Sequence, residues 1–155
     1  MSNPVVAVIG IPGKWSTEVL ADRLEAKTGS RHVIDMADVT FDSTHGTLMA
    51  NHFDLTQCDG IAVKKISQQY SPSTLDRLEL LRVAEAQGVR VFSPATSMLR
   101  LIDRLSCTIT MQNHGIPMPD TCVTESIEDA VTFIQASDAV VLKPLFSTKA
   151  RGMTV

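Results

Sequence analysis

The chain has 155 residues, of which 44% are apolar and 20% are charged, and its formal net charge is −3. These proportions are those of an ordinary globular protein and argue against a disordered tail or a collagen-like repeat. The small negative charge excludes a global basic field that would hold nucleic acid. No run of apolar residues is long enough to span a membrane, so no membrane partner is expected.

The three cysteines of the chain are Cys58, Cys107 and Cys122, and no C-x-x-C pair occurs. They are interpreted as reduced thiols, without a disulfide framework or a zinc site. The N-terminal residues lack the basic segment and the longer apolar run of a signal peptide. We therefore expect a cytoplasmic protein.

The first half of the chain alternates apolar strands with helices. A β-branched run over Val5–Ile9 predicts a buried parallel strand, and the segment Gly10–Gly13 predicts a turn. A helix is expected from an N-cap at Ser16 to Gly29, followed by a short strand within Arg31–Met36. This order is typical of the start of a β-α-β unit.

The middle of the chain continues this alternation after a different segment. Val39–Leu55 is polar and weakly alternating, which predicts a hairpin or a long loop. Strands are expected over Ile61–Val63 and Val89–Phe92, with a helix over Thr74–Gln87 between them. The whole pattern indicates a three-layer α/β domain with a mostly parallel sheet.

The last third begins with one long helix predicted over Ser97–His114. Its buried side is expected to consist of Leu101, Ile102, Leu105 and Ile109. After a Pro-rich turn, the pattern predicts a strand over Thr121–Thr124, a helix capped by Ser126 that ends near Gln135, and a strand over Val140–Leu145.

The end of the chain combines a lysine with a loop of small residues. The strand predicted over Val140–Leu145 carries Lys143, and the loop follows at residues 147–152. Small residues let backbone amides approach an anion closely, and a lysine on the preceding strand adds a positive charge. The lysine precedes the loop, so the segment is not a P-loop.

Three segments together resemble a known family: Asp103-Arg104, the run GIPMPDT over Gly115–Thr121, and the run VVLKPL over Val140–Leu145. Their order and spacing resemble those of the ATP-grasp ligases, in the branch of RimK-like and glutathione synthetase-like enzymes. The resemblance covers nearly the whole chain.

The resemblance implies three parts. Residues 1–95 would form a Rossmann-like pre-ATP-grasp domain, and residues 96–119 a linking helix and Pro-rich turn. Residues 120–155 would be the incomplete α+β start of the ATP-grasp N-subdomain.

The resemblance also implies a nucleotide site. Enzymes of this family use ATP and magnesium to convert a carboxylate into an acylphosphate, which an amine then attacks. The residues of this chain at the ATP-binding positions are Arg104, Lys143, Thr148 and Gly152. Arg104 stands where the family has a lysine, and Ser147 and Ala150 stand where its loop has glycines.

Two lysines are candidates for a substrate cleft. Lys14 lies in the turn after the first strand, and Lys65 follows a central strand, at the sheet edge where open α/β sheets bind ligands. One alternative is a tight turn in which Trp15 covers the core. The other is a pair of solvated lysines, Lys64 and Lys65, without a ligand.

The expected function is the N-terminal portion of an ATP- and magnesium-dependent carboxylate–amine ligase, with glutamate as the candidate amine. Its acceptor would be a small molecule or a peptide. No acidic cluster in the chain matches the family's magnesium ligands, so the chain alone is expected to be inactive. The alternative is a non-catalytic α/β binding or dimerisation module of ATP-grasp ancestry. Exposed apolar surface near residues 140–145 and a homo-oligomer are also expected.

Overall fold

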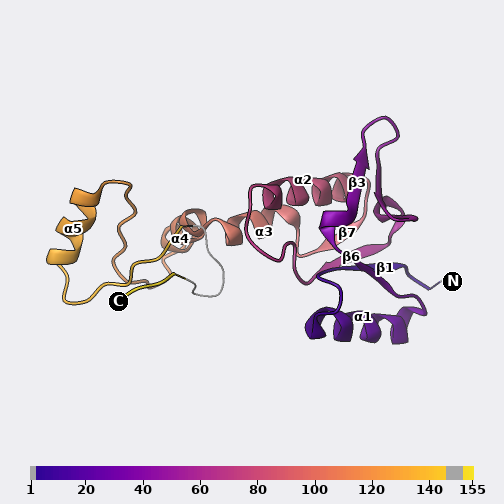
Figure 1. Cartoon of the computed structure of the whole chain (residues 1–155), viewed down its shortest axis with the longest axis horizontal. Helices are drawn as coiled ribbons and strands as arrows, with labels where there is room; N and C mark the ends of the chain where they lie inside the picture. Colours follow the sequence, from indigo (N-terminus) through magenta and orange to yellow (C-terminus); the bar gives the residue numbers. More distant parts are fainter. Residues whose placement is uncertain (1–2, 146–151) are drawn as a thin grey trace. The chain divides into compact units, whose positions relative to one another are not determined.

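A computed structural model describes residues 3–145 and 152–155 of the chain. The chain divides into two compact units, Met1–Leu99 and Arg100–Val155. Both sheets and helices α1 and α2 belong to the first unit, and helices α4 and α5 belong to the second (Figure 1). No helix in the described ranges is both long enough and apolar enough to cross a membrane.

A four-stranded parallel sheet with the order β2-β1-β6-β7 forms the centre of the first unit. Its strands are β1 (Val6–Ile9), β2 (His32–Ile34), β6 (Gly60–Val63) and β7 (Arg90–Phe92). Helix α1 (Trp15–Thr28) covers one face of the sheet and α2 (Ser73–Ala86) covers the other (Figure 1). The predicted α/β fold with a mostly parallel sheet is confirmed.

The core of this unit explains why its strands are apolar throughout. Ala7, Val8 and Ile9 of β1 are at most 1% exposed, because helices cover both faces of the sheet. Ile61 on β6 and Leu81 on α2 are fully buried as well. Burial of each large aliphatic side chain stabilises the unit by about 1.5–3 kcal/mol.

A small antiparallel sheet lies between β2 and β6 in the chain. It consists of β3 (Val39–Asp42), β4 (Thr47–Ala50) and β5 (Phe53–Asp54), so the predicted hairpin is confirmed. Short 3-10 turns, η1 (Met36–Asp38) and η2 (Leu55–Gln57), lead into and out of this sheet.

The start of α1 differs from the prediction. The N-cap is Lys14 and not Ser16, and no side chain caps the helix there. The predicted end is confirmed, because Gly29 adopts the left-handed conformation (φ 78°) that terminates a helix. Trp15 is 79% exposed, so it does not cover the core.

The prediction of a single long helix over Ser97–His114 is wrong. Two helices occupy this segment, α3 (Ala95–Ile102) and α4 (Arg104–Asn113). Asp103 separates them, because its carboxylate accepts hydrogen bonds from the backbone N–H of Leu105 (3.0 Å) and Ser106 (3.2 Å). An aspartate in this position caps a new helix rather than continuing the previous one.

The remainder of the second unit contains less strand than predicted. Residues 121–124 form no strand, and over residues 140–145 only Leu142 makes a bridge, antiparallel to Thr154. Helix α5 (Ile127–Gln135) is confirmed together with its cap, the Ser126 hydroxyl, which accepts from the Asp129 amide at 3.2 Å.

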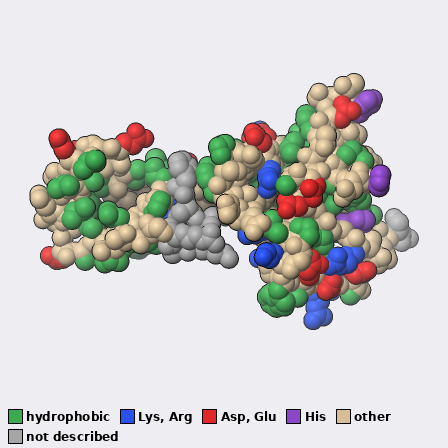
Figure 2. Space-filling model, viewed as in Figure 1, with side chains coloured by type: hydrophobic (Ala, Val, Ile, Leu, Met, Phe, Trp, Pro, Cys, Tyr) green, Lys and Arg blue, Asp and Glu red, His purple; other side chains and the backbone are tan. Residues whose placement is uncertain are grey.

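The second unit has no buried residue among its described positions, 100–145 and 152–155. The side of the predicted helix that was expected to be buried is largely exposed, with Leu101 at 70% and Ile109 at 46%. Ile127 on α5 is 82% exposed, and Val141 and Leu142 are each about half exposed. Figure 2 shows hydrophobic side chains on the surface of this unit. The expected exposed apolar surface near residues 140–145 is therefore present.

Candidate functional site

Three loops meet at the carboxyl edge of the parallel sheet. The amide of Gly10, just after β1, donates to the carbonyl of Ile34 at the end of β2 (3.0 Å). The amides of Lys64 and Lys65, just after β6, both donate to the carbonyl of Ile9 (2.8 and 3.2 Å). These bonds fasten the first residues of each loop to a neighbouring strand.

The strand order places a topological switch point between β1 and β6. The chain runs from β1 through α1 to β2 on one side, and from β6 through α2 to β7 on the other side. In open α/β sheets, ligands bind in the crevice beyond the carboxyl ends of the two strands at this point. We call the segments on its two sides, residues 10–14 and 64–66, the switch-point crevice.

The β1–α1 turn is held tightly on the side that faces the helix. A Cβ atom on Gly10 would lie 2.6 Å from Oγ1 and Cγ2 of Thr17, so no larger residue fits without displacement. Gly13 has a φ of 76°, which favours glycine, and its amide donates to Oε1 of Glu18 at 2.6 Å. Lys14 follows as the exposed N-cap of α1.

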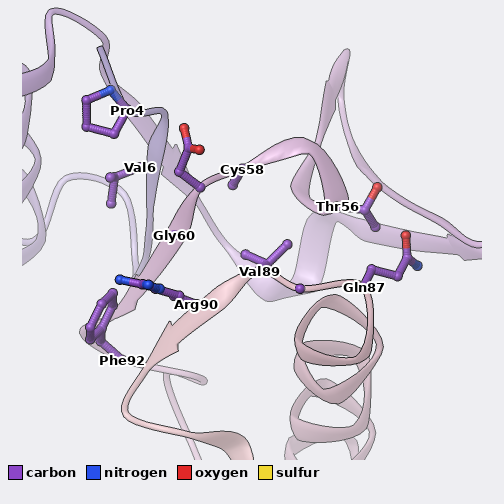
Figure 3. Close-up of a pocket in the computed structure, with 11 residues that line it drawn as sticks. Pro4, Val6, Thr56, Cys58, Gly60, Gln87, Val89, Arg90 and Phe92 are labelled. Carbon is purple, nitrogen blue, oxygen red and sulfur yellow. The ribbon is translucent and has the colours of Figure 1, made fainter. Parts of the chain in front are cut away.

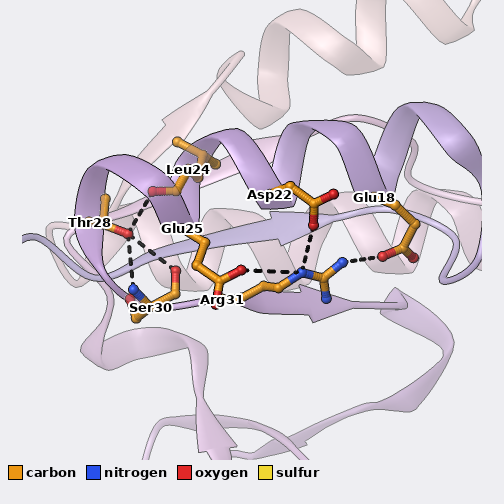
Figure 4. A network of polar contacts seen from close by, with 7 residues as sticks. All are labelled: Glu18, Asp22, Leu24, Glu25, Thr28, Ser30 and Arg31. Atoms are coloured by element: carbon orange, nitrogen blue, oxygen red, sulfur yellow. Dashed lines mark hydrogen bonds and ion pairs between the residues drawn. The ribbon is translucent and has the colours of Figure 1, made fainter.

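Glu18 also belongs to a network of charges on the outside of α1 (Figure 4). Arg31 forms ion pairs with Glu18 and with Asp22, whose Oδ1 lies 3.0 Å from the guanidinium. Glu25 lies 3.9 Å from the same guanidinium. The hydrogen bond from Gly13 and then Arg31 lower the pKa of Glu18. Glu18 is therefore a fixed anion that secures the start of α1.

Arg77 on α2 secures the other side of the crevice. Its Nη1 donates to the carbonyl of Ile66 at 3.1 Å and lies 3.9 Å from Oδ1 of Asp35, which follows β2. Asp35 in turn accepts from the amide of Ala37 at 2.9 Å. Arg77 thus ties the loop that carries Lys65 to the end of a different strand. Sequence reasoning missed this contact, because it joins residues that are distant in the chain.

Positive charge remains unbalanced at the switch-point crevice. Within residues 3–145 and 152–155, Lys14, Lys64 and Lys65 form no ion pair. The neighbouring acidic side chains, Glu18 in the first turn of α1 and Asp35 after β2, are occupied by the contacts described above. The structure therefore places both predicted cleft lysines at the carboxyl edge of the sheet, beside the switch point.

A cavity of about 530 Å³ lies at the opposite, amino edge of the sheet (Figure 3). Val6, Gly60 and Arg90, at the starts of three strands, line it together with Cys58 and Phe92. Burial, followed by the charges of two nearby aspartates, raises the pKa of Cys58 to about 11. Its thiol stays protonated at neutral pH and is a poor nucleophile. None of the predicted site residues lines this cavity.

The predicted nucleotide residues lie in the second unit. Arg104 is the first residue of α4, and Lys143 is an exposed residue next to the bridge that joins Leu142 and Thr154. This bridge has N–O distances of 2.8 and 3.1 Å and holds together the two ends of the predicted phosphate loop.

Gly152 lies beside the base of that loop. Its φ is 69°, and a Cβ on it would lie 3.1 Å from Cγ of Pro144. Thr148, with Ser147 and Ala150, lies outside the described residues. The bridge therefore brings the segment that carries Lys143, an exposed cation, close to Gly152.

A magnesium site does not fit the described residues. Over 3–145 and 152–155, no group of three or more His, Cys, Asp or Glu side chains is placed to hold a metal ion. Asp103 is unsuitable because it caps α4 and accepts from the Ser106 hydroxyl at 2.8 Å. That bond and the backbone amides lower its pKa.

Two curated proteins are similar to the chain in sequence, although no family model matches it. A tetrahydromethanopterin:α-L-glutamate ligase of Methanosarcina acetivorans is 23% identical over 148 residues, which are 92% of this chain and 46% of that protein. The enzyme of the same name from Methanocaldococcus jannaschii is 29% identical over 65 residues, 42% of this chain and 22% of that protein.

Solved structures of the ATP-grasp ligase PsnB are similar in fold. PsnB complexed with a minimal precursor has a TM-score of 0.68 at 16% identity, over 95% of this chain and 55% of that one. PsnB with a phosphomimetic variant of that precursor, magnesium and ADP has a TM-score of 0.72 at 13% identity, over 96% and 57%. The chain has the fold of an ATP-grasp ligase.

The predicted resemblance to the ATP-grasp ligases is confirmed by the sequence matches and the shared fold together. The chain spans about half the length of the relatives that match most of it, 46% of the Methanosarcina protein and 55% of PsnB.

Proposed function

We propose that the chain is part of an ATP- and magnesium-dependent ligase that joins a carboxylate to an amine through an acylphosphate. The observation that carries this proposal is the ATP-grasp fold over 95% of the chain, with a TM-score of 0.68. The sequence match to two glutamate ligases supports glutamate as the amine. The RimK-like branch and a cytoplasmic location are part of the same proposal.

In this proposal the second unit contributes one side of the nucleotide site. Lys143 and Arg104 neutralise phosphate charge, and Gly152 and Thr148 belong to the loop over the phosphates. Positioning and neutralisation are the main contributions of protein to phosphoryl transfer, so these cations are suited to the task. No step is assigned to magnesium within the described residues, because they offer no ligand set.

The first unit contributes the acceptor cleft in this proposal. The exposed Lys14 and the half-buried Lys65 border the switch-point crevice and bind an acidic small molecule or peptide. PsnB is described in complex with a precursor peptide and AMPPNP, which supports a peptide as one class of acceptor. Residues 1–95, 96–119 and 120–155 would form the pre-ATP-grasp domain, the linker and the start of the N-subdomain.

The chain by itself is proposed to be catalytically inactive, because its described residues hold no metal cluster. A homo-oligomer is part of the proposal as well. The exposed apolar side chains of the second unit, such as Ile127 at 82%, favour a second candidate function, a non-catalytic binding or dimerisation module.

An activity assay separates the two functions. The test protein is a chimaera that joins this chain, at the end of its match to the Methanosarcina acetivorans ligase, to the residues that follow the matched segment in that ligase. ADP formation is measured with ATP, magnesium, glutamate and a panel of carboxylic acids. The ligase function predicts glutamate-dependent ADP formation by the chimaera and none by the chain alone. A folded chimaera that forms no ADP with any acid would favour the binding module.

A further inference from the structure

Trp15 is the single tryptophan of the chain and lies at the switch-point crevice. As the first residue of α1 it is 79% exposed. An indole carries a large apolar surface that proteins rarely leave in water, and exposed tryptophans are enriched where ligands or partners bind. No heavy atom lies within 4 Å of a Cβ built on Gly13, so the space beside the turn is open.

The charged side chains near this indole that form no ion pair within the described residues are lysines, because Glu18 in the first turn of α1 is paired with Arg31. Lys14 is adjacent to Trp15 in sequence, and Lys64 and Lys65 leave β6 at the position where β6 pairs with the end of β1. The nearby Asp35 is bound to Arg77 and to a backbone amide, so it does not neutralise the lysines. The crevice thus offers exposed positive charge and an exposed aromatic face at the same sheet edge.

Both sides of the crevice are fixed before any ligand arrives. The β1–α1 turn is held by the Gly13 amide, which donates to Glu18 at 2.6 Å. The opposite loop is held by the two lysine amides on the Ile9 carbonyl and by the Arg77 bond to Ile66. Binding of a ligand here therefore loses little free energy to ordering of the two loop backbones.

We propose that the switch-point crevice binds a small anion that carries a planar aromatic ring. Its acidic group is neutralised by Lys14 and Lys65, and its ring stacks on the indole of Trp15. This inference rests on the proposed function, because it assigns a chemical class to the acceptor of the ligase. Stacking on tryptophan and charge neutralisation are separate contributions, so each can be removed alone.

The test is a calorimetric titration of the whole chain with p-aminobenzoyl-L-glutamate, an aromatic dianion, at low ionic strength. L-glutamate, which lacks the ring, and the dimethyl ester, which lacks the charge, are the comparison ligands. We expect saturable binding of the dianion, with both comparison ligands at least about tenfold weaker, which is about 1.4 kcal/mol for each. The emission of Trp15 should be quenched by the dianion and unaffected by L-glutamate.

Matched variants assign the binding to the crevice. Trp15→Ala and Lys65→Gln should each weaken binding of the dianion by about tenfold. Phe92→Ala removes an exposed aromatic that lines the cavity at the amino edge, and Lys27→Gln removes an exposed lysine at the other end of α1. Both controls should bind like the unmodified chain. Far-ultraviolet circular dichroism verifies that all four variants fold.

Three results would overturn the inference. They are no saturable binding up to about 10 mM dianion, equal binding of the dimethyl ester, or unchanged binding by Trp15→Ala and Lys65→Gln. A shift of Trp15 emission with protein concentration alone would mean that a second copy covers the indole, which also contradicts the inference. The titration contains no ATP, so its failure is distinguishable from a failure of the ligase assay.

Discussion

Limited proteolysis of the whole chain is expected to cleave within residues 100–155 at least about a hundredfold faster than within Met1–Leu99. Every buried apolar side chain of the described residues lies in the first unit, so this unit must unfold before a protease can cut its core. The described part of the second unit buries none, so little free energy opposes its opening. Mass spectrometry of a thermolysin digest should find a stable fragment that ends near Leu99.

Two substitutions serve as opposite controls for this result. Ile61→Ala removes a fully buried side chain and should destabilise the first unit by about 2–5 kcal/mol, which exposes it to cleavage. Ile127→Ser changes a side chain that is 82% exposed and should leave the digestion pattern unchanged. Similar cleavage rates in both units of the unmodified chain would show that the second unit has a core of its own.

Gly10→Ala is expected to destabilise the first unit by about 1–3 kcal/mol, the usual range for an overpacked core. The added Cβ would lie 2.6 Å from two atoms of Thr17, a side chain that is only 1% exposed and cannot move away freely. Gly10 joins β1 to the crevice turn, so the displacement would also disturb Lys14. Urea denaturation followed by circular dichroism measures the loss in the free energy of unfolding.

The steric cause can be isolated with a second substitution. Thr17→Ala removes both clashing atoms, so the Gly10→Ala/Thr17→Ala double variant should lose less stability than the sum of the single variants. Gly13→Ala is the matched control, because its added Cβ meets nothing within 4 Å. The only expected loss is the strain of holding alanine in the left-handed conformation, about 1–2 kcal/mol of the free energy of unfolding. Strict additivity in the double variant would exclude the clash as the cause.

The first unit could be predicted closely from its sequence. The run over Val5–Ile9 is apolar throughout, because helices cover both faces of β1, and the pattern alone identifies such a strand. The end of α1 was also predictable, because Gly29 adopts the left-handed conformation that closes a helix. The start of α1 was not, because its N-cap, Lys14, makes no side-chain hydrogen bond of the kind that Ser16 was expected to make.

The second unit was predicted less well, for one reason in its helices and another in its strands. The apolar spacing through residues 97–114 suggested one buried helix, but the local capping bonds of Asp103 break it in two. The run over Val140–Leu145 has strand character, yet within the described residues Leu142 pairs only with Thr154. A strand requires a partner, and sequence pattern alone cannot provide one.

The candidate site was predictable in part. Lys14 and Lys65 were placed after strands from the strand pattern, and in the structure both lie at the carboxyl edge of the parallel sheet. The Arg77 contacts and the exposure of Trp15 depend on how α1 and α2 pack on the sheet. No local signal in the sequence reports such packing.

We propose that this chain contributes Lys143 to the nucleotide site of an ATP-grasp ligase. The most direct test is calorimetric titration of AMP-PNP with magnesium into the chain alone, the chimaera described above, and its Lys143→Ala variant, with Lys27→Ala as the control. We expect micromolar binding by the chimaera, at least about tenfold weaker binding by Lys143→Ala, and only millimolar binding by the chain alone. A folded chimaera that binds no nucleotide, or binds it equally well without Lys143, would show that Lys143 is not part of a nucleotide site.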